Sequence, residues 1–282
     1  MEGVRNGLLL WYERILPALL PFSVISYILV ATNNLSFFSK ILHPLIKRVI
    51  PVSPQGVYPL LAGFLFGFPL GSKIVSQLLE TEQISIKEAQ ILLSVCNNIS
   101  PVFITGYMVH QCIGNDRYMF PAIVCIYLPP LLFGSLQMRR TEKIDVHQKN
   151  AAPRSQITFK IMDAGIMNAF ETLLKLCGYI VIFSILCQPL LFLQKRLPAF
   201  ALGISGLLEI TNGISFICNY SLKKTVMFLL CNTITAFGGL SGIAQTSSMI
   251  GDTSLSVKAY VRDKFLFSIG TLILSVLYLR CI

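Results

Sequence analysis

The sequence has 282 residues, of which 54% are hydrophobic and only 13% are charged. Soluble domains carry roughly a quarter charged residues, so this composition excludes an ordinary soluble domain and indicates a polytopic membrane protein. The formal net charge of +10 would suggest a nucleic-acid partner in a soluble chain. In a membrane protein, Lys and Arg collect in cytoplasmic loops, and no nucleic-acid partner is expected.

Uncharged stretches mark the expected membrane crossings. A crossing needs about 20 apolar residues, and runs that reach or approach this length lie at 15–39, 89–115, 118–138, 176–194 and 225–251. A further run at 265–279 is shorter, and it could span a bilayer only if Lys264 and Arg280 snorkelled at its ends. The eight cysteines show neither CxxC nor His/Cys ligand spacing, so no disulfide framework and no metal site is expected.

In the first half, two polar interruptions stand inside apolar sequence. The segment GFPLGSK at 67–73 interrupts the stretch 57–80 with glycines, a hydroxyl and one lysine, which predicts the tip of a re-entrant helical hairpin. The pentapeptide CNNIS at 96–100 lies in the middle of the run 89–115. Unpartnered amides and hydroxyls cost several kcal/mol each in hydrocarbon, so polar groups at this depth indicate a binding site.

A basic segment separates the two halves. Residues 139–160 contain six Lys or Arg residues and two acidic ones, and they predict a flexible cytoplasmic linker. The expected domains are therefore a first membrane repeat at 1–138, the linker at 139–160 and a second membrane repeat at 161–282.

The second half repeats the pattern of the first. The segment GLLEITN at 206–212, inside the stretch 197–220, corresponds to the first hairpin tip. The pentapeptide CNTIT at 231–235 corresponds to CNNIS. Two re-entrant hairpins leave three crossings in each half, so the halves are expected to be inverted relative to each other. Counting each hairpin as a full crossing is the alternative, and it lessens the charge asymmetry between the two sides. In the favoured all-α topology with hairpins, one side is the more basic and hence cytoplasmic. Its charges are Lys40, Lys47, Arg48, Lys87, the linker, Lys258, Arg262 and Lys264.

Four of these segments together resemble a known family. The pieces ILPALLPF at 15–22, GFPLGSK at 67–73, CNNISP at 96–101 and FGGLSG at 237–242 are similar to those of sporulation integral membrane proteins of the YlbJ type, also called stage V sporulation protein V, which carry two nucleoside-recognition (Gate) domains. The resemblance covers nearly the whole chain. It implies an inverted-repeat fold akin to concentrative nucleoside transporters, a cell membrane or outer forespore membrane of a spore-forming bacterium, and transport of dipicolinic acid.

The candidate substrate-binding residues are the polar groups of the hairpin tips, the pentapeptides and the FGGLSG segment. They are Ser72, Lys73, Asn97, Asn98, Ser100, Glu209, Thr211, Asn212, Asn232, Thr233, Thr235 and Ser241. We expect the Lys73 ammonium to attract a carboxylate of the substrate and Glu209 to accept a coupling proton or cation. The glycines Gly67, Gly71, Gly206 and Gly213 are expected to make backbone turns rather than ligand contacts.

Plainer interpretations remain open beside these. The amides and hydroxyls could join helix to helix as packing contacts, and Lys73 with Glu209 could form a structural ion pair. No nucleophile with a base and no catalytic motif is found, so we expect neither an enzyme nor a cofactor. The expected partners are the bilayer and a small anion. A non-transporting scaffold, a nucleoside transporter-like protein, and assembly into a homo-oligomer or with other sporulation membrane proteins stay open.

Overall fold

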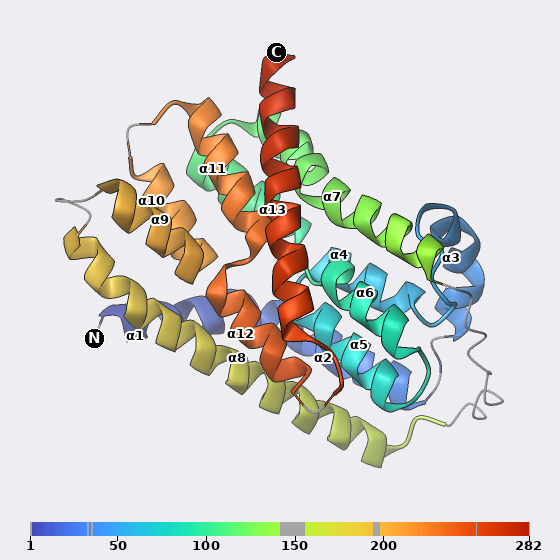
Figure 1. The fold of residues 1–282 in the computed structure, drawn as a ribbon. Coiled ribbons are helices and arrows are strands. Elements are labelled where there is room, and N and C mark those ends of the chain that lie inside the picture. Colours follow the sequence, from blue (N-terminus) through green and yellow to red (C-terminus); the bar gives the residue numbers. More distant parts are fainter. Residues whose placement is uncertain are drawn as a thin grey trace.

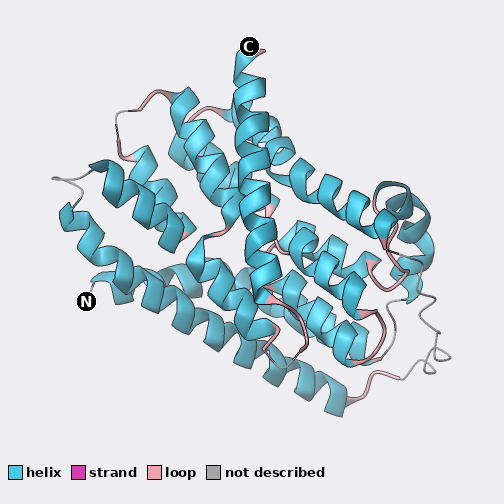
Figure 2. Cartoon of the chain, viewed as in Figure 1, coloured by secondary structure: helices cyan, strands magenta, loops and turns pink. Residues whose placement is uncertain are grey.

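The chain folds as a set of packed helices. The computed structural model describes residues 2–32, 34, 36–141, 156–193, 198–220, 222–251 and 253–281, and this part of the chain contains no strand (Figure 2). The helices of the first half are α1 (Glu2–Leu10), the π-helix η1 (Trp11–Ile15), α2 (Leu16–Ala31), α3 (Ser36–Val49), α4 (Val57–Phe66), α5 (Leu70–Glu80), α6 (Ile86–Cys96), the π-helix η2 (Phe103–Ile113), the 3-10 helix η3 (Asp116–Tyr118) and α7 (Met119–Arg140). Those of the second half are α8 (Phe159–Leu193), α9 (Pro198–Leu208), α10 (Ile210–Cys218), α11 (Lys224–Phe237), α12 (Gly239–Met249) and α13 (Val257–Arg280).

The same order of elements occurs in both halves. A pair of short helices comes first, α4 with α5 and then α9 with α10, and each pair is followed by a broken helix, α6–η2 and then α11–α12. A long helix closes each half, α7 in the first and α13 in the second. The order agrees with a duplicated unit, whereas the inverted relation of the two units to a membrane stays a prediction.

Helix α13 occupies the middle of the molecule. It contacts α6, α7, α11 and α12, so it touches helices of both halves. Figure 1 shows α13 in red at the centre, with α9 and α10 on one side of it in this view and α4 and α5 on the other. The long helix α8 runs beside α1 and α2. Because α13 links both halves, its buried side chains are placed to meet the polar segments of each.

Three helical stretches of the described chain are long and apolar enough to cross a bilayer. They are Asp116–Arg140, Phe159–Leu190 and Lys224–Met249. The first and third match the expected runs 118–138 and 225–251, although the third is broken at Gly238. The expected run 15–39 is wrong as one crossing, because α2 ends at Ala31 and α3 begins at Ser36. The run 176–194 is the second part of a longer helix that already begins at Phe159.

The linker prediction falls mostly on residues outside the described chain. Residues 142–155 lie outside it, and at the two ends α7 continues to Arg140 while α8 begins at Phe159. The predicted boundaries at 138/139 and 160/161 therefore fall inside helices. The helix ends at Arg140 and Phe159 lie within two residues of these boundaries, and the division into two repeats and a linker stays a prediction.

Both predicted hairpins are present as helix pairs. The stretch 57–80 contains α4 and α5, and 197–220 contains α9 and α10. In the first pair the turn uses Gly67, whose φ is +79°, a value that favours glycine. In the second pair the turn is Glu209, which lies between helices that end at Leu208 and begin at Ile210.

The other glycines of the hairpins serve close packing, so their expected role as turn residues is wrong. Gly71 lies inside α5, where a Cβ would stand 2.7 Å from the carbonyl oxygen of Cys96. Gly206 in α9 and Gly213 in α10 face each other, and a Cβ on Gly213 would stand 2.4 Å from the Cα of Gly206. Gly71 lets α5 approach the end of α6, while Gly206 and Gly213 let the two helices of the second hairpin approach backbone to backbone, which is how small residues act in membrane helix packing.

Candidate functional site

A polar cavity lies between the two halves of the chain. Its volume is about 360 Å³, within the range of roughly 300–1,000 Å³ typical of ligand pockets. Helix α5 of the first half lines it opposite α8 of the second half, and the ends of α2 and α12 complete it. The lining residues are Tyr27, Val30, Ala31, Lys73, Ser76, Gln77, Glu80, Thr81, Asn168, Glu171, Thr172, Lys175, Ser248 and Met249.

Lys73 is the buried cation of this cavity. Its side chain is 7% exposed, and its Nζ donates to the carbonyl oxygen of Asn168 at 3.2 Å and to the Thr172 hydroxyl. The two acceptors lie one turn apart on α8, so the ammonium of the first half is held by the second half. The predicted site residue Lys73 therefore does line a cavity between the halves. Its neighbour Ser72 is buried and donates to the carbonyl oxygen of Pro69, which fixes the hairpin turn instead.

The cavity also contains polar atoms without a protein partner. The Oδ1 atom of Asn168 and the Oε1 atom of Gln77 are buried and accept no hydrogen bond within the described chain. Buried polar atoms are satisfied in the great majority of cases, so unpaired atoms that line a cavity indicate groups available to a ligand or to water. Farther out, Lys175 pairs with Glu171 at 2.8 Å, and both of these side chains are exposed.

The irregular segments of the two halves meet near the centre of the fold. The amide of Phe68, at the tip of the first hairpin, donates to the carbonyl oxygen of Asn98 in the break between α6 and η2, at 2.7 Å. A Cβ on Gly239, at the break between α11 and α12, would stand 3.4 Å from the Leu208 carbonyl oxygen at the second hairpin tip. A Cβ on Gly242 would touch the Phe68 ring at 3.2 Å.

The first pentapeptide forms this break and is held by α13. The Nδ2 atom of Asn97 donates to the hydroxyls of Thr246 at 2.6 Å and Tyr260 at 2.9 Å, which joins α6 to α12 and α13. The Nδ2 atom of Asn98 donates to the Val95 carbonyl oxygen at 2.6 Å, and Ser100 accepts from the amide of Phe103 at 3.3 Å. Most of these polar groups are therefore used in protein contacts, although the Oδ1 atom of Asn97 is buried without a partner.

A buried lysine on α13 completes the break, and the sequence interpretation missed it. Lys264 is 1% exposed, and its Nζ donates to the Asn97 carbonyl oxygen at 3.1 Å and to Oδ1 of Asn98 at 2.9 Å. The expectation that Lys264 is a loop charge or snorkels at a helix end is wrong, because α13 begins at Val257 and places Lys264 in its second turn. The sequence signal is the spacing of Tyr260, Lys264 and Phe267 at helical intervals.

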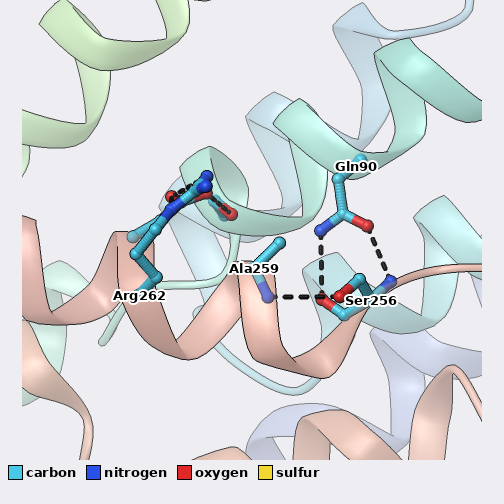
Figure 3. A network of polar contacts seen from close by, with 6 residues as sticks. Gln90, Ser256, Ala259 and Arg262 are labelled. Carbon is cyan, nitrogen blue, oxygen red and sulfur yellow. Dashed lines mark hydrogen bonds and ion pairs between the residues drawn. The ribbon is translucent and has the colours of Figure 1, made fainter.

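The start of α13 is fixed to α6 by a pair of amide contacts (Figure 3). The Nε2 atom of Gln90 donates to the Ser256 carbonyl oxygen at 3.2 Å, and the Ser256 amide donates to Oε1 of Gln90 at 2.7 Å. The Ser256 hydroxyl also accepts from the amide of Ala259, as an N-terminal helix cap does. Farther along α13, seven residues beyond Ser256, Asp263 accepts from the hydroxyl of Ser94 at 2.8 Å and pairs with Arg262. These contacts set the register that brings Lys264 to the break.

The second pentapeptide occupies a different structural position from the first. Asn232, Thr233 and Thr235 lie inside α11, which continues to Phe237, so the equivalence of CNTIT with CNNIS is wrong. The break of this half is made by Gly238 and Gly239, whose φ values are +91° and +68°. The expected equivalence compared only the residue types of the two pentapeptides. The position at which a helix ends in this apolar run is set instead by glycine, which admits a left-handed backbone.

The polar groups of α11 pack mainly against α13 and η2. Asn232 is fully buried and donates to the Ser275 hydroxyl at 3.1 Å, while Thr235 donates to Sδ of Met108 at 3.3 Å. The Thr233 hydroxyl bonds within its own helix, to the carbonyl oxygen of Leu229. The Thr233 carbonyl oxygen accepts from the Ser268 hydroxyl at 2.9 Å, and Ser268 is only one turn beyond Lys264 on α13. The two pentapeptides thus meet neighbouring turns of the same helix, at Lys264 and at Ser268.

Glu209 acts as the cap of α10. Its carboxylate accepts from the amides of Thr211 at 3.1 Å and Asn212 at 2.8 Å, and from Nδ2 of Asn212 at 3.0 Å. An ion pair between Lys73 and Glu209 is therefore wrong, because each has other partners. Ser241 in α12 accepts from Nε2 of Gln245 at 3.0 Å. Of the predicted site residues, the structure places Lys73 in the cavity and most of the others in helix ends and interhelical contacts.

The two pentapeptide asparagines are expected to respond differently to Leu. Asn97→Leu removes the hydrogen bonds to α12 and α13 at the break and should lower both thermal stability and substrate binding. Asn232→Leu removes one interhelical hydrogen bond, worth about 1 kcal/mol, and should leave binding unchanged. Thermal melting and ligand titration of both purified variants check this. Equal loss of binding in both variants would instead support one shared site.

The class of the protein follows from these features. An all-helical chain with apolar helices long enough to cross a bilayer, broken helices and buried interhelical polar contacts is a polytopic α-helical membrane protein. A polar cavity at the interface of its halves is the arrangement found in secondary transporters.

The comparisons with known proteins agree with this class. Residues 13–110 match the Gate family, described as "Nucleoside recognition", and this match lies within the first predicted repeat. The chain is 26% identical over 296 aligned residues to the "Sporulation integral membrane protein YlbJ" of Bacillus subtilis (strain 168), covering 92% of this chain and 72% of that protein. No solved structure matches. The family resemblance expected from the sequence motifs is confirmed, and the chain is an integral membrane protein related to a sporulation protein.

Proposed function

We propose that the chain is a sporulation-associated transporter for a small anion such as dipicolinic acid. The relative's name supports a role in sporulation, and the family resemblance implies the outer forespore membrane as the place of transport. The anion is the part of the proposal that depends on the site. Dipicolinate carries two carboxylates that are ionised at neutral pH, because carboxyl groups ordinarily titrate near pH 4.

The observation that carries the proposal is the cavity around Lys73. It offers an ammonium group that is 7% exposed, set between helices of the two halves. A dianion that leaves water needs positive charge or hydrogen-bond donors in compensation, and a partly desolvated ammonium supplies both. The side-chain amides of Gln77 and Asn168 border the same space, and an anion would use their NH2 groups as donors, whereas their unpaired oxygens are acceptors and would not bind it.

The position of the cavity supports transport over a purely structural role. Lys73 is on α5 of the first hairpin, while its acceptors are on α8 of the second half. A relative movement of the halves would therefore open or close the contact around the cation. Substrate sites of secondary transporters lie at such interfaces between repeats and use broken helices nearby.

A nucleoside is the second candidate substrate. The description of the Gate family as "Nucleoside recognition" favours it, since the match covers α5 and therefore Lys73. A nucleoside carries no charge, so it would use the amides of Gln77 and Asn168 rather than the ammonium. The two substrates would thus use different groups of the same cavity, the anion mainly the ammonium and the nucleoside the amides.

Uptake into liposomes that contain the purified protein tests the proposal. We expect radiolabelled dipicolinate to accumulate in these vesicles and not in protein-free ones, and unlabelled nucleosides not to compete. Uptake of nucleosides alone would assign the second substrate. Absence of uptake of either compound, by protein that melts cooperatively, would contradict transport and support a scaffold.

A further inference from the structure

The break after α6 holds a cation supplied by the chain itself. Helix α6 ends at Cys96, and the last carbonyl groups of a helix lack partners within the helix and carry the negative end of its dipole. The Nζ atom of Lys264 lies at this end, 3.1 Å from the Asn97 carbonyl oxygen and 2.9 Å from Oδ1 of Asn98. An amide oxygen and a main-chain oxygen therefore hold the ammonium.

No carboxylate of the described chain pairs with this ammonium. The neighbouring Asp263 turns to Ser94 and Arg262 instead. The rings of Tyr260 and Phe267 each have their centroid 5.9 Å from Nζ, within the distance at which a cation is attracted to an aromatic face. Neutral oxygens, a helix end and aromatic rings thus compensate a charge that is 1% exposed.

The second helix break borders the same lysine. A Cβ on Gly238 would stand 3.5 Å from Cε of Lys264. The side chain therefore runs between the break of the first half and the break of the second. The cavity around Lys73 does not include Lys264 among its lining residues, so the two buried lysines occupy separate positions.

In secondary transporters, carbonyl oxygens of unwound segments and the C-terminal ends of half-helices coordinate the coupling Na⁺. We propose that the Lys264 ammonium is a tethered cation that fills this position, so that the chain binds no Na⁺ at its first helix break. Lys264 is not a substrate contact in this arrangement, because its donors are engaged with Asn97 and Asn98. That Lys264 fills the position does not depend on transport, whereas the consequence for ion coupling rests on the proposed function.

Thermal melting of the detergent-solubilised protein tests the inference without a substrate. We expect the wild-type Tm to be the same in sodium chloride and in choline chloride of equal ionic strength, because the position is already filled. A rise in Tm that is specific to Na⁺, and that Lys264→Met retains, would place a bound Na⁺ elsewhere in the fold and leave the inference intact. A Na⁺-specific rise that Lys264→Met abolishes would overturn it.

Shortening the side chain should open the position to external cations. Lys264→Ala is expected to lower Tm by about 5–10 °C, since it leaves buried oxygens unpaired, and Na⁺ or n-butylammonium should restore part of the loss while choline does not. Lys264→Arg should stay closer to wild type because it keeps the charge. Lys258→Ala is the matched control, because Lys258 is an exposed lysine on the same helix, and its Tm should not respond to the cation. A Lys264→Ala protein that melts with the same Tm in every salt contradicts the inference.

If Lys264→Ala does not fold, Lys264→Met and the wild-type salt comparison still decide the matter. The liposome assay adds the coupling consequence, in which uptake by the wild type should be equal with and without a Na⁺ gradient. Na⁺-driven uptake that Lys264→Met abolishes would overturn the inference while leaving transport established. Absence of all uptake would contradict the proposed function alone, since the melting experiments do not depend on it.

Discussion

Replacing Gly63 with alanine is expected to destabilise the protein more than any other small substitution in the first hairpin. An added Cβ would stand 1.9 Å from the carbonyl oxygen of Cys96 and 2.8 Å from its carbonyl carbon, and these are backbone atoms at the end of α6. The helix α4 would have to move away from the break. Overpacking of a core ordinarily costs about 1–3 kcal/mol, and a clash with backbone should reach at least the upper end of that range.

The measurement is thermal melting followed with a thiol-reactive dye, because cysteines such as Cys96, Cys125 and Cys231 are buried until the protein unfolds. Gly178→Ala is the matched control. Gly178 is an exposed helical glycine of α8, and an added Cβ there meets no atom within 4 Å. Its replacement should be neutral or stabilise by up to about 1 kcal/mol, through helix propensity. If Gly63→Ala melted like Gly178→Ala, the close contact between α4 and the α6 break would not exist in solution.

Replacing Lys73 with methionine should weaken dipicolinate binding by about 1.5–3 kcal/mol, or roughly 10- to 150-fold in Kd. Methionine keeps much of the side-chain volume, but it supplies neither the charge nor the donors. Lys73→Arg should retain part of the affinity, because the charge survives while the shape changes. Calorimetric titration of the wild type and both variants in detergent provides the measurement.

Lys175, the second lysine that lines the cavity, provides the control for the loss of a positive charge without the loss of the buried ammonium. Lys175 is exposed and pairs with Glu171, so Lys175→Met should change the binding free energy by less than about 1 kcal/mol. Equal losses for Lys73→Met and Lys175→Met would indicate a general electrostatic effect of the cavity. Wild-type affinity in Lys73→Met would show that the lysine is structural and serves to join α5 to α8.

The sequence predicts the fold class and both hairpins well because their signals are local. Apolar runs define the membrane class, and glycine and proline at 67–71 interrupt one such run where α4 ends and α5 begins. Lys73 is likewise visible as a lone charge in an apolar hairpin. The partner of Lys73 is not visible, because α8 reaches it from 95 residues away along the chain.

The central cation could not be recognised by charge counting. Lys264 looks like the flank of a short apolar run, and only the extension of α13 back to Val257 turns it into an interior residue. The buried positions Tyr260, Lys264 and Phe267 recur at helical spacing, which is the pattern that indicates one buried face. The glycine pair 238–239 similarly gives the true second break, while the resemblance of two pentapeptides draws attention to Asn232, about two turns earlier.

The main-chain hydrogen bond from Phe68 to Asn98 has a consequence for how the molecule can move. It couples the tip of the first hairpin to the adjoining broken helix, and Lys264 couples that broken helix to α13. Displacing any one of these three elements would therefore break a buried hydrogen bond. The tip of the second hairpin is closed by its own Glu209, and within the described chain no main-chain bond ties it to the glycine break that it faces. The two hairpins are thus held unequally. Moving the tip of α9–α10 away from the glycine break would rupture no main-chain bond, although it would break the hydrogen bond from the Tyr107 hydroxyl to the Thr211 carbonyl oxygen, at 3.2 Å.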